Sequence, residues 1–236
     1  CSLAIRRGSR NVLLGAKGSG KTTLFQHCNA LLRPLTGVVR YAGSPVDYRR
    51  AGLRELRSKV GMVFQNPDRQ LFSASVQEDV SFGPLNLGLD MATVRQRVTG
   101  ALQAVGMQAQ ADKAVHNLSF GQKKRVCIAG VLAMDPELLI LDEPMAGVNP
   151  ALTQSLLDHI KDLKKNGTTV LFVEHDMHMV RHISDWVIVM AEGKVVAEGP
   201  PAQVMKDPAV IDAYLGAHAD TDLGTVAINV PGKAGN

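Results

Sequence analysis

The feature that most constrains this chain is the glycine-rich segment Gly15-Ala-Lys-Gly-Ser-Gly-Lys21-Thr22. It fits the pattern G-x-x-x-x-G-K-[ST], follows the apolar run of residues 11–14 and precedes residues 24–32, which have helical character. A strand, a glycine loop and a helix in this order turn backbone N–H groups and the positive end of the helix dipole toward a phosphate. The segment therefore predicts a site for a nucleoside triphosphate.

The residues of this loop have separate expected roles. Lys21 would place a compact positive charge on the β and γ phosphates, and the Thr22 hydroxyl is expected to ligate Mg²⁺. The alternative is a glycine-rich turn beside a solvated lysine, which the strand and helix on either side disfavour. The expected ligands of the loop are a nucleoside triphosphate and Mg²⁺, and the expected phosphate-binding residues are Gly15, Gly18, Ser19, Gly20, Lys21, Thr22 and Thr23.

Two acidic residues follow a run of four aliphatic residues, 138–141, and are themselves followed by Pro144. A buried strand that ends in acids delivers carboxylates to the edge of a parallel sheet where ligands bind. Asp142 is expected to hold Mg²⁺ through water, and Glu143 to orient or deprotonate the attacking water. The alternative is that these acids only cap a helix after Pro144.

A second polar cluster, Glu174-His175-Asp176, ends the apolar run of residues 169–173. If both runs are parallel strands, His175 lies at the same edge as Glu143 and is expected to reach the γ-phosphate. The spacing of the other histidines considered does not suggest a metal cluster; they are His27, His116, His159, His178 and His182.

Strand-like and helix-like segments alternate along the chain. Strands are expected at 59–64, 138–141, 169–173 and 186–190, and helices at 122–134 and 151–165. Residues 75–114 are helical in pattern, with a break at Gly83-Pro84 and a second helix over 91–105, as in an inserted helical block. The alternation predicts an α/β fold with a mostly parallel sheet flanked by helices on both faces.

The two ends of the chain have their own expectations. Residues 1–5, Cys-Ser-Leu-Ala-Ile, alternate like the middle of a strand, so we interpret the N-terminal strands as truncated. The segment after residue 216 has turn residues without a sustained period and is expected to be loosely ordered.

Composition narrows the class of protein. The 236 residues are 45% hydrophobic and 20% charged, which is typical of a globular domain and excludes a disordered or coiled-coil chain. Cys1, Cys28 and Cys127 lack the paired spacing of a zinc site or disulfide framework and are interpreted as thiols. The longest apolar stretch, 126–133, is far shorter than the roughly 20 residues that span a bilayer. The net charge of +4 does not decide between partners.

The segment Leu118-Ser-Phe-Gly-Gln122, followed by Lys-Lys-Arg, begins a predicted helix. It resembles the signature motif of the ATP-binding-cassette (ABC) ATPases, and the phosphate loop, Gln65, the Leu-Asp-Glu-Pro segment and His175 stand in that family's order. The resemblance covers about residues 1–200. It implies a P-loop NTPase domain over 1–200 with a helical ABC subdomain at about 70–135, and a C-terminal helix with a loose tail over 201–236.

The resemblance also implies a set of site residues. Gln65 would contact Mg²⁺ or the attacking water at the joint to the helical insertion, although an exposed loop amide is the plainer alternative. The implied catalytic residues are Glu143, His175, Gln65 and Lys21, and the implied Mg²⁺ ligands are Thr22, Gln65 and Asp142. Ser119, Gly121 and Gln122 are implied nucleotide contacts.

The position of the signature predicts an assembly. Ser119 and the Gly121 N–H are expected at a helix N-terminus, which favours anions, but on the insertion and away from their own phosphate loop. They would therefore serve the ATP of a second ABC ATPase subunit, identical or not, arranged head to tail. The other implied partner is a transmembrane permease or energy-coupling subunit at the cytoplasmic face of the cell membrane, and no nucleic-acid partner is expected.

Four positions depart from the family pattern. Phe120 stands where glycine is usual, Lys17 where asparagine is frequent, Met145 where threonine or serine is usual, and Asn149 where aspartate is usual. The family's aspartate communicates across the dimer, so Asn149 implies slower hydrolysis or coupling. The aromatic residue that stacks on adenine in this family lies upstream of the present start, so no residue is assigned to it.

The chain's segments disagree about the transported solute. Residues 66–72 and 76–86 resemble the cobalt, nickel and vitamin importers of the energy-coupling-factor type, whereas residues 173–177 and 207–216 resemble branched-chain amino-acid importer ATPases. The expected function is the ATP-hydrolysing subunit of a bacterial importer for cobalt, nickel or another energy-coupling-factor substrate, with the branched-chain type as the alternative.

Two further alternatives belong to other classes. A soluble ABC protein acting on ribosomes or DNA would be expected to carry paired cassettes, a long coiled-coil insertion or zinc-binding cysteines, and the sequence shows none of them. A regulatory cassette with weak ATPase activity is suggested by Asn149 and Phe120.

Overall fold

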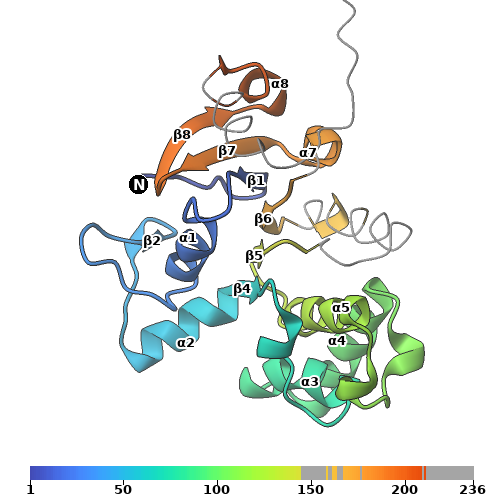
Figure 1. Cartoon of the computed structure of the whole chain (residues 1–236). Coiled ribbons are helices and arrows are strands. Elements are labelled where there is room, and N and C mark those ends of the chain that lie inside the picture. The colour runs from blue at the N-terminus through green and yellow to red at the C-terminus, as the bar shows by residue number, and fades with distance from the viewer. Residues whose placement is uncertain (145–157, 159–160, 164–166, 176, 209, 211–236) are drawn as a thin grey trace, which may run out of the picture.

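The computed structural model describes residues 1–144, 158, 161–163, 167–175, 177–208 and 210. A six-stranded sheet of order β4-β5-β6-β1-β7-β8 crosses the molecule (Figure 1). Five strands run parallel: β1 (Arg10–Leu14), β4 (Val60–Val63), β5 (Leu138–Leu141), β6 (Thr169–Val173) and β7 (Trp186–Ala191). The edge strand β8 (Lys194–Gly199) is antiparallel to β7.

Successive residues of the central strands pack into two different core clusters. Val12 and Leu14 of β1 belong to one cluster, and Leu13 between them belongs to the other. The strands β5, β6 and β7 divide in the same way, because side chains of a strand point alternately to the two faces of its sheet. Both faces are therefore buried, which explains why these strands read as continuous apolar runs.

Helices cover both faces of the sheet (Figure 1). The helices α1 (Lys21–Cys28) and α2 (Arg50–Lys59) pack on one face through Phe25 and Leu56. The helices α5 (Phe120–Leu132), α7 (Met177–Ile183) and α8 (Pro201–Val204) contribute to the cluster on the other face. Residues of α3 (Val76–Asn86) and α4 (Met91–Ala104) belong to that same cluster, so the helical group α3–α5 is continuous with the sheet's core.

Short elements connect these parts. A two-stranded hairpin is formed by β2 (Arg40–Tyr41) and β3 (Ser44–Pro45). Single 3-10 turns lie at η1 (Pro67–Arg69), η2 (Gln108–Gln110) and η3 (Val115–Asn117). The turn η1 joins the end of β4 to the helical group, and Asn66 caps it by accepting a hydrogen bond from the Asp68 N–H.

The α/β class, the mostly parallel sheet and the flanking helices are confirmed, but some predicted boundaries are wrong. The first helix spans Lys21–Cys28 and not 24–32. Gly20 takes a left-handed conformation just before the helix, and the left-handed Ala30, with φ of 51°, prevents the helix from continuing. The expected break at Gly83-Pro84 is absent, since α3 continues through Pro84 to Asn86. A proline this near the end of a helix removes only one late backbone hydrogen bond.

The N-terminal segment is not a strand in this structure. Residues 1–6 have no regular secondary structure, although Leu3 and Ile5 pack against the cluster on the α1 side of the sheet. The predicted helix over 122–134 begins earlier, at Phe120, because Ser119 and Gln122 form a capping box at its start. Most of the helix expected at 151–165 lies outside the described residues.

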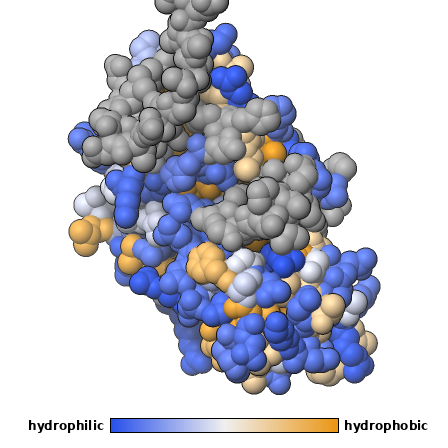
Figure 2. Space-filling view, turned by 45° about the vertical axis from the view of Figure 1, so that its right-hand side comes forward, coloured by the Kyte–Doolittle hydropathy of each residue, from blue (hydrophilic) through white to orange (hydrophobic). Residues whose placement is uncertain are grey.

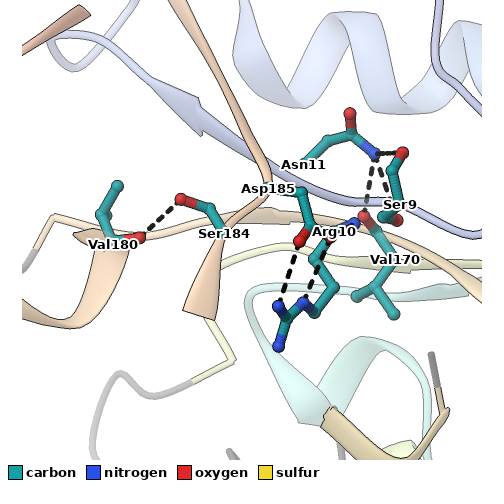
Figure 3. A network of polar contacts seen from close by, with 7 residues as sticks. All are labelled: Ser9, Arg10, Asn11, Val170, Val180, Ser184 and Asp185. Atoms are coloured by element: carbon teal, nitrogen blue, oxygen red, sulfur yellow. Dashed lines mark hydrogen bonds and ion pairs between the residues drawn. The ribbon is translucent and has the colours of Figure 1, made fainter. Parts of the chain in front are cut away.

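A polar network joins β1 to the start of β7 (Figure 3). The Arg10 guanidinium donates to both carboxylate oxygens of Asp185, at 3.3 and 3.1 Å, and the Arg10 N–H donates to the same carboxylate at 2.8 Å. The Asp185 N–H returns a bond to the Arg10 carbonyl at 2.8 Å. Nearby, the buried Asn11 amide donates to the Val170 carbonyl of β6. These bonds fix β1, the strand that leads into the glycine loop.

Candidate nucleotide site

The glycine loop connects β1 to α1 at the carboxyl edge of the sheet. Gly15 has φ of 147°, and a Cβ there would lie 2.3 Å from the Met190 carbonyl oxygen and 2.6 Å from Ser19 Oγ. Gly20 has φ of 98° at the start of α1. Only glycine fits both positions without strain, because side chains disfavour positive φ and the loop packs directly on β7. The Gly193 N–H supports the loop by donating to the Ser19 carbonyl at 3.0 Å.

Lys21 folds back over this loop. Its Nζ donates to the carbonyl oxygens of Gly15, at 2.7 Å, and Ala16, at 3.0 Å, and the residue is only 8% exposed. Burial lowers the pKa of Lys21, while the nearby carboxylates of Glu143 and Asp142 act in the opposite direction. The ammonium is therefore held where it can exchange carbonyl partners for a phosphate.

Ser19 offers a further test of whether the loop suits a phosphate. Its Oγ is buried and has no hydrogen-bond partner in the described part of the chain. A buried hydroxyl without a partner is costly unless a ligand or water satisfies it. The loop therefore combines glycines at positive φ with a buried hydroxyl that needs a partner, and both features fit a bound phosphate group.

Asp142 lies directly after β5 and faces the first turn of α1. Thr22 Oγ1 donates to Asp142 Oδ2 at 3.0 Å. Burial raises the pKa of Asp142, and the hydrogen bond from Thr22 opposes that rise. Hydroxyl and carboxylate oxygens are the ligands that Mg²⁺ prefers, so this pair fits the predicted ion.

Two of the predicted residues contact the carboxylate of Glu143. Gln65 Nε2 donates to Oε2 at 2.7 Å, and His175 Nε2 lies 3.3 Å from Oε1. Gln65 follows β4, Glu143 follows β5 and His175 follows β6, so three neighbouring parallel strands deliver them to one sheet edge. The arrangement can hold a water molecule and accept its proton.

The signature residues do not join this cluster. Ser119 Oγ accepts from the Gln122 N–H at 3.3 Å, and Gln122 Oε1 accepts from the Ser119 N–H at 2.9 Å. This capping box begins α5, which lies apart from α1 in the view of Figure 1. The structure therefore groups Lys21, Thr22, Asp142, Glu143, Gln65 and His175, and leaves Ser119, Gly121 and Gln122 on the helical group.

One residue of the site was missed in the sequence. Lys124 of α5 is completely buried, and its Nζ donates to the backbone carbonyl of Glu143. The available signal was its helical spacing, since Lys124 lies three residues before Cys127 and four before Ile128 on the buried face of α5. The departures Met145 and Asn149, together with His159 and Asp176, lie outside the described residues.

Comparison with known protein families agrees with this geometry. A family model described as ABC transporter matches residues 1–146. A second model, described as branched-chain amino acid ATP-binding cassette transporter, matches residues 194–220.

Curated relatives resemble nearly the whole chain. The energy-coupling factor transporter ATP-binding protein EcfA of Methanocaldococcus jannaschii is 48% identical over 203 residues, which cover 86% of this chain and 73% of the relative. EcfA3 of Clostridium perfringens is 45% identical over 211 residues, covering 89% and 74%.

Solved structures share the fold. The chain is similar to cbiO1 of Clostridium perfringens, part of the ABC transporter complex cbiONQ, with a TM-score of 0.79, 42% identity and coverage of 93% of this chain and 87% of that one. It is also similar to the cassette MJ0796 in a dimeric post-hydrolysis state bound to ADP and Pi, with a TM-score of 0.78, 26% identity and coverage of 84% and 88%. The glycine loop, the Asp142–Glu143 pair and these likenesses lead to one conclusion: the chain belongs to the ABC transporter family, as an ATP hydrolase that couples its reaction to transport.

Proposed function

We propose that this chain energises an importer of the energy-coupling-factor type, whose substrate is cobalt, nickel or another solute of that group. The observation that carries the proposed ATP hydrolysis is the convergence of Gln65 and His175 on the Glu143 carboxylate, beside Lys21 and Asp142. The relatives named as energy-coupling-factor ATP-binding proteins support the type of importer.

The residues of the site have distinct proposed roles in hydrolysis. Glu143 accepts the proton of the attacking water. Gln65 and His175 hold the two carboxylate oxygens of Glu143 in place. Lys21 leaves the loop carbonyls and binds the β and γ phosphates, while the loop N–H groups surround them. Thr22, Asp142 and Gln65 would hold Mg²⁺, which when bound neutralises charge that develops on the phosphates.

A second cassette completes the site in this proposal. Ser119 begins α5 in the helical group, and a helix N-terminus favours an anion, so in this proposal it binds the γ-phosphate of ATP held by a partner cassette. The likeness to a dimeric cassette supports a head-to-tail pair. ATP then lies between the two chains and stabilises the dimer until it is hydrolysed.

A groove beside the segment that follows Gln65 is the proposed contact for the membrane partner. Its cavity of roughly 980 Å³ lies between α2 and the helical group, with Leu53, Arg50 and Arg54 on one side. Phe72 and Phe82 line the other side, 64% and 49% exposed, with ring centroids 4.7 Å apart. Figure 2 shows orange patches over the lower half of the molecule, where the helical group lies.

Attachment to the membrane depends on this partner in our proposal. Among the residues that the structure describes, no helix is long and apolar enough to cross a bilayer. The chain would therefore bind at the cytoplasmic face through a transmembrane permease or energy-coupling subunit.

A branched-chain amino-acid importer is the second candidate. The match of residues 194–220 to the branched-chain family model favours it. Because the ATPase does not contact the solute in either kind of importer, the membrane partner decides between them.

The test is to isolate the tagged full chain from its own membranes and identify the proteins that remain bound. The complex is then reconstituted in vesicles and supplied with Mg-ATP and labelled cobalt, nickel or leucine, with Lys21→Ala as the inactive control. Uptake of a metal that requires ATP supports the first candidate. Uptake of leucine favours the second, and isolation with ribosomes or DNA alone contradicts both.

A further inference from the structure

Lys124 is a charged residue in an apolar position. It is 0% exposed and lies among buried residues of α5, including Val126, Cys127 and Ile128. Lysine is almost never fully buried unless its ammonium is paired, because transfer of the charge out of water is costly. Complete buried ion pairs can often be replaced by apolar side chains of similar volume without loss of stability, so a buried charge is weak evidence for a stabilising role. Stability alone therefore does not explain a lysine here.

The partner of Lys124 is the backbone of Glu143. The ammonium donates to the Glu143 carbonyl oxygen, and the Phe120 ring, with its centroid 5.9 Å from Nζ, lies beside it. Glu143 has φ of 50°, a left-handed conformation that is uncommon for a residue with a side chain. Such conformations persist when the surrounding structure holds them in place, and they cluster at functional sites.

The helix α5 contacts both chain segments whose side chains form the Gln65–Glu143 hydrogen bond. Besides the bond from Lys124, Lys123 Nζ lies 2.7 Å from Asp68 Oδ1, and Cys127 Sγ lies 3.8 Å from the Pro67 carbonyl oxygen. Asp68 and Pro67 belong to η1, which follows Gln65. One helix therefore contacts both backbone segments that carry the paired side chains.

We propose that Lys124 is a positioning residue for hydrolysis: its ammonium holds the Glu143 backbone in the left-handed conformation that aims the carboxylate at Gln65 and His175. This inference rests on the proposed role of Glu143 as the base. Displacing a reacting group by about 1 Å can cost roughly 10²-fold in rate. Loss of this one bond is therefore expected to affect the chemical step and leave nucleotide binding intact.

The experiment compares the full chain with Lys124→Met, Lys124→Arg and Lys59→Met. Methionine fills similar volume without a donor, arginine restores donors, and Lys59 is a control lysine in an exposed pair with Glu55. We measure kcat, KM, the Kd of a fluorescent ATP analogue and the thermal midpoint. Lys124→Met is expected to lower kcat by about 10- to 100-fold with Kd within about twofold. The thermal midpoint should fall by only a few degrees, because the Glu143 carbonyl loses one donor. Lys124→Arg should recover part of the rate, and Lys59→Met should match wild type.

A second measurement does not depend on turnover. Hydrogen exchange of a peptide covering residues 138–144 should become faster in Lys124→Met and remain unchanged in Lys59→Met, because the Glu143 backbone loses its tether. If Lys124→Met fails to fold, Lys124→Gln, which has a shorter side chain, takes its place in both measurements with the same expectation.

The outcomes separate the two proposals. A wild-type kcat with unchanged exchange in Lys124→Met overturns the positioning role, as does a fall in kcat that only parallels a fall in the thermal midpoint. Glu143→Gln is the reference for the base. If that variant hydrolyses ATP as wild type does, the proposed role of Glu143 fails, while the exchange measurement still reports whether Lys124 holds its backbone.

Discussion

Gln65 Nε2 and Glu143 Oε2 lie 2.7 Å apart, although the two residues are 78 positions apart in the chain. Each residue follows a strand, β4 or β5, and these strands are neighbours in the sheet. The hydrogen bond thus couples the carboxylate to the segment η1, which leads into the helical group. A displacement of that group by a partner would reach Glu143 through Gln65.

Replacing Glu143 by glutamine is expected to separate binding from hydrolysis. Glutamine keeps the shape of the side chain and can still contact Gln65, but it cannot accept a proton from water. Hydrolysis should fall by about 10²- to 10⁴-fold while the Kd for ATP stays near the wild-type value. Phosphate release and nucleotide titration measure the two quantities. Turnover at the wild-type rate would show that another group is the base.

Lys21→Ala is expected to remove nucleotide binding. The ammonium is the compact charge inside the loop, and alanine leaves the loop carbonyls of Gly15 and Ala16 facing the phosphates without it. We expect a loss of affinity of at least about 100-fold, or about 2.7 kcal/mol. Lys17→Ala is the matched variant, since Lys17 is an exposed lysine of the same loop, and should lose less than about threefold. Equal losses in both variants would contradict the assignment.

Much of the site was predictable because the chemistry lies in short local patterns. The glycine loop, the acids after β5 and His175 after β6 each follow a buried strand, and parallel strands bring their carboxyl ends together whatever the loops between them. The roles of Gln65 and Ser119 came from the family resemblance, because an isolated amide or hydroxyl carries no pattern of its own.

What the sequence did not predict depends on tertiary contacts. Lys124 stands in the basic run Lys-Lys-Arg, and the packing of α5 in the structure shows that it is buried and bonded to Glu143. The ends of α1 depend on backbone conformations at Gly20 and Ala30, which propensity alone does not specify. The alternating residues 1–5 formed no strand, since alternation needs a neighbouring strand to pair with.

Ser119→Ala is expected to affect two properties of different origin. The hydroxyl caps α5, so its loss should cost about 1 kcal/mol of unfolding free energy. It should also weaken the ATP-driven dimer, measured by light scattering in the Glu143→Gln background, while ATP affinity of the single chain is unchanged.

The chain provides a matched control for this change. Ser75 forms the same kind of capping box with Glu78 at the start of α3, so Ser75→Ala should show the stability loss alone. Loss of ATP binding by monomeric Ser119→Ala would mean that the signature acts on its own loop, and the head-to-tail arrangement would have to be abandoned.

Asp185→Ala is expected to destabilise the fold through β1. Three hydrogen bonds from Arg10 to the carboxylate would be lost, and the guanidinium would remain partly buried, with 16% of its side chain exposed. We expect the free energy of unfolding, measured by urea denaturation, to fall by about 2 kcal/mol. Asp158→Ala, which breaks an exposed pair with Lys161, should cost less than about 0.5 kcal/mol. A similar loss in both variants would show that the Arg10–Asp185 contact is no stronger than a surface pair.

The last prediction concerns alkaline pH and Cys127. Burial raises the pKa of the Cys127 thiol from 9.0 to about 12, with smaller contributions from nearby charges. The folded state therefore keeps the thiol proton, which the unfolded state releases above about pH 9. The free energy of unfolding is unaffected by this thiol below about pH 9 and decreases as the pH rises from 9 toward 12. By about pH 10.5 this thiol should have lowered the free energy of unfolding by roughly 2 kcal/mol relative to its value below pH 9. Urea unfolding of wild type and Cys127→Ala at a series of pH values measures it: the wild type should lose more stability above pH 9 than the variant, and parallel curves would mean that the thiol titrates normally in the folded protein.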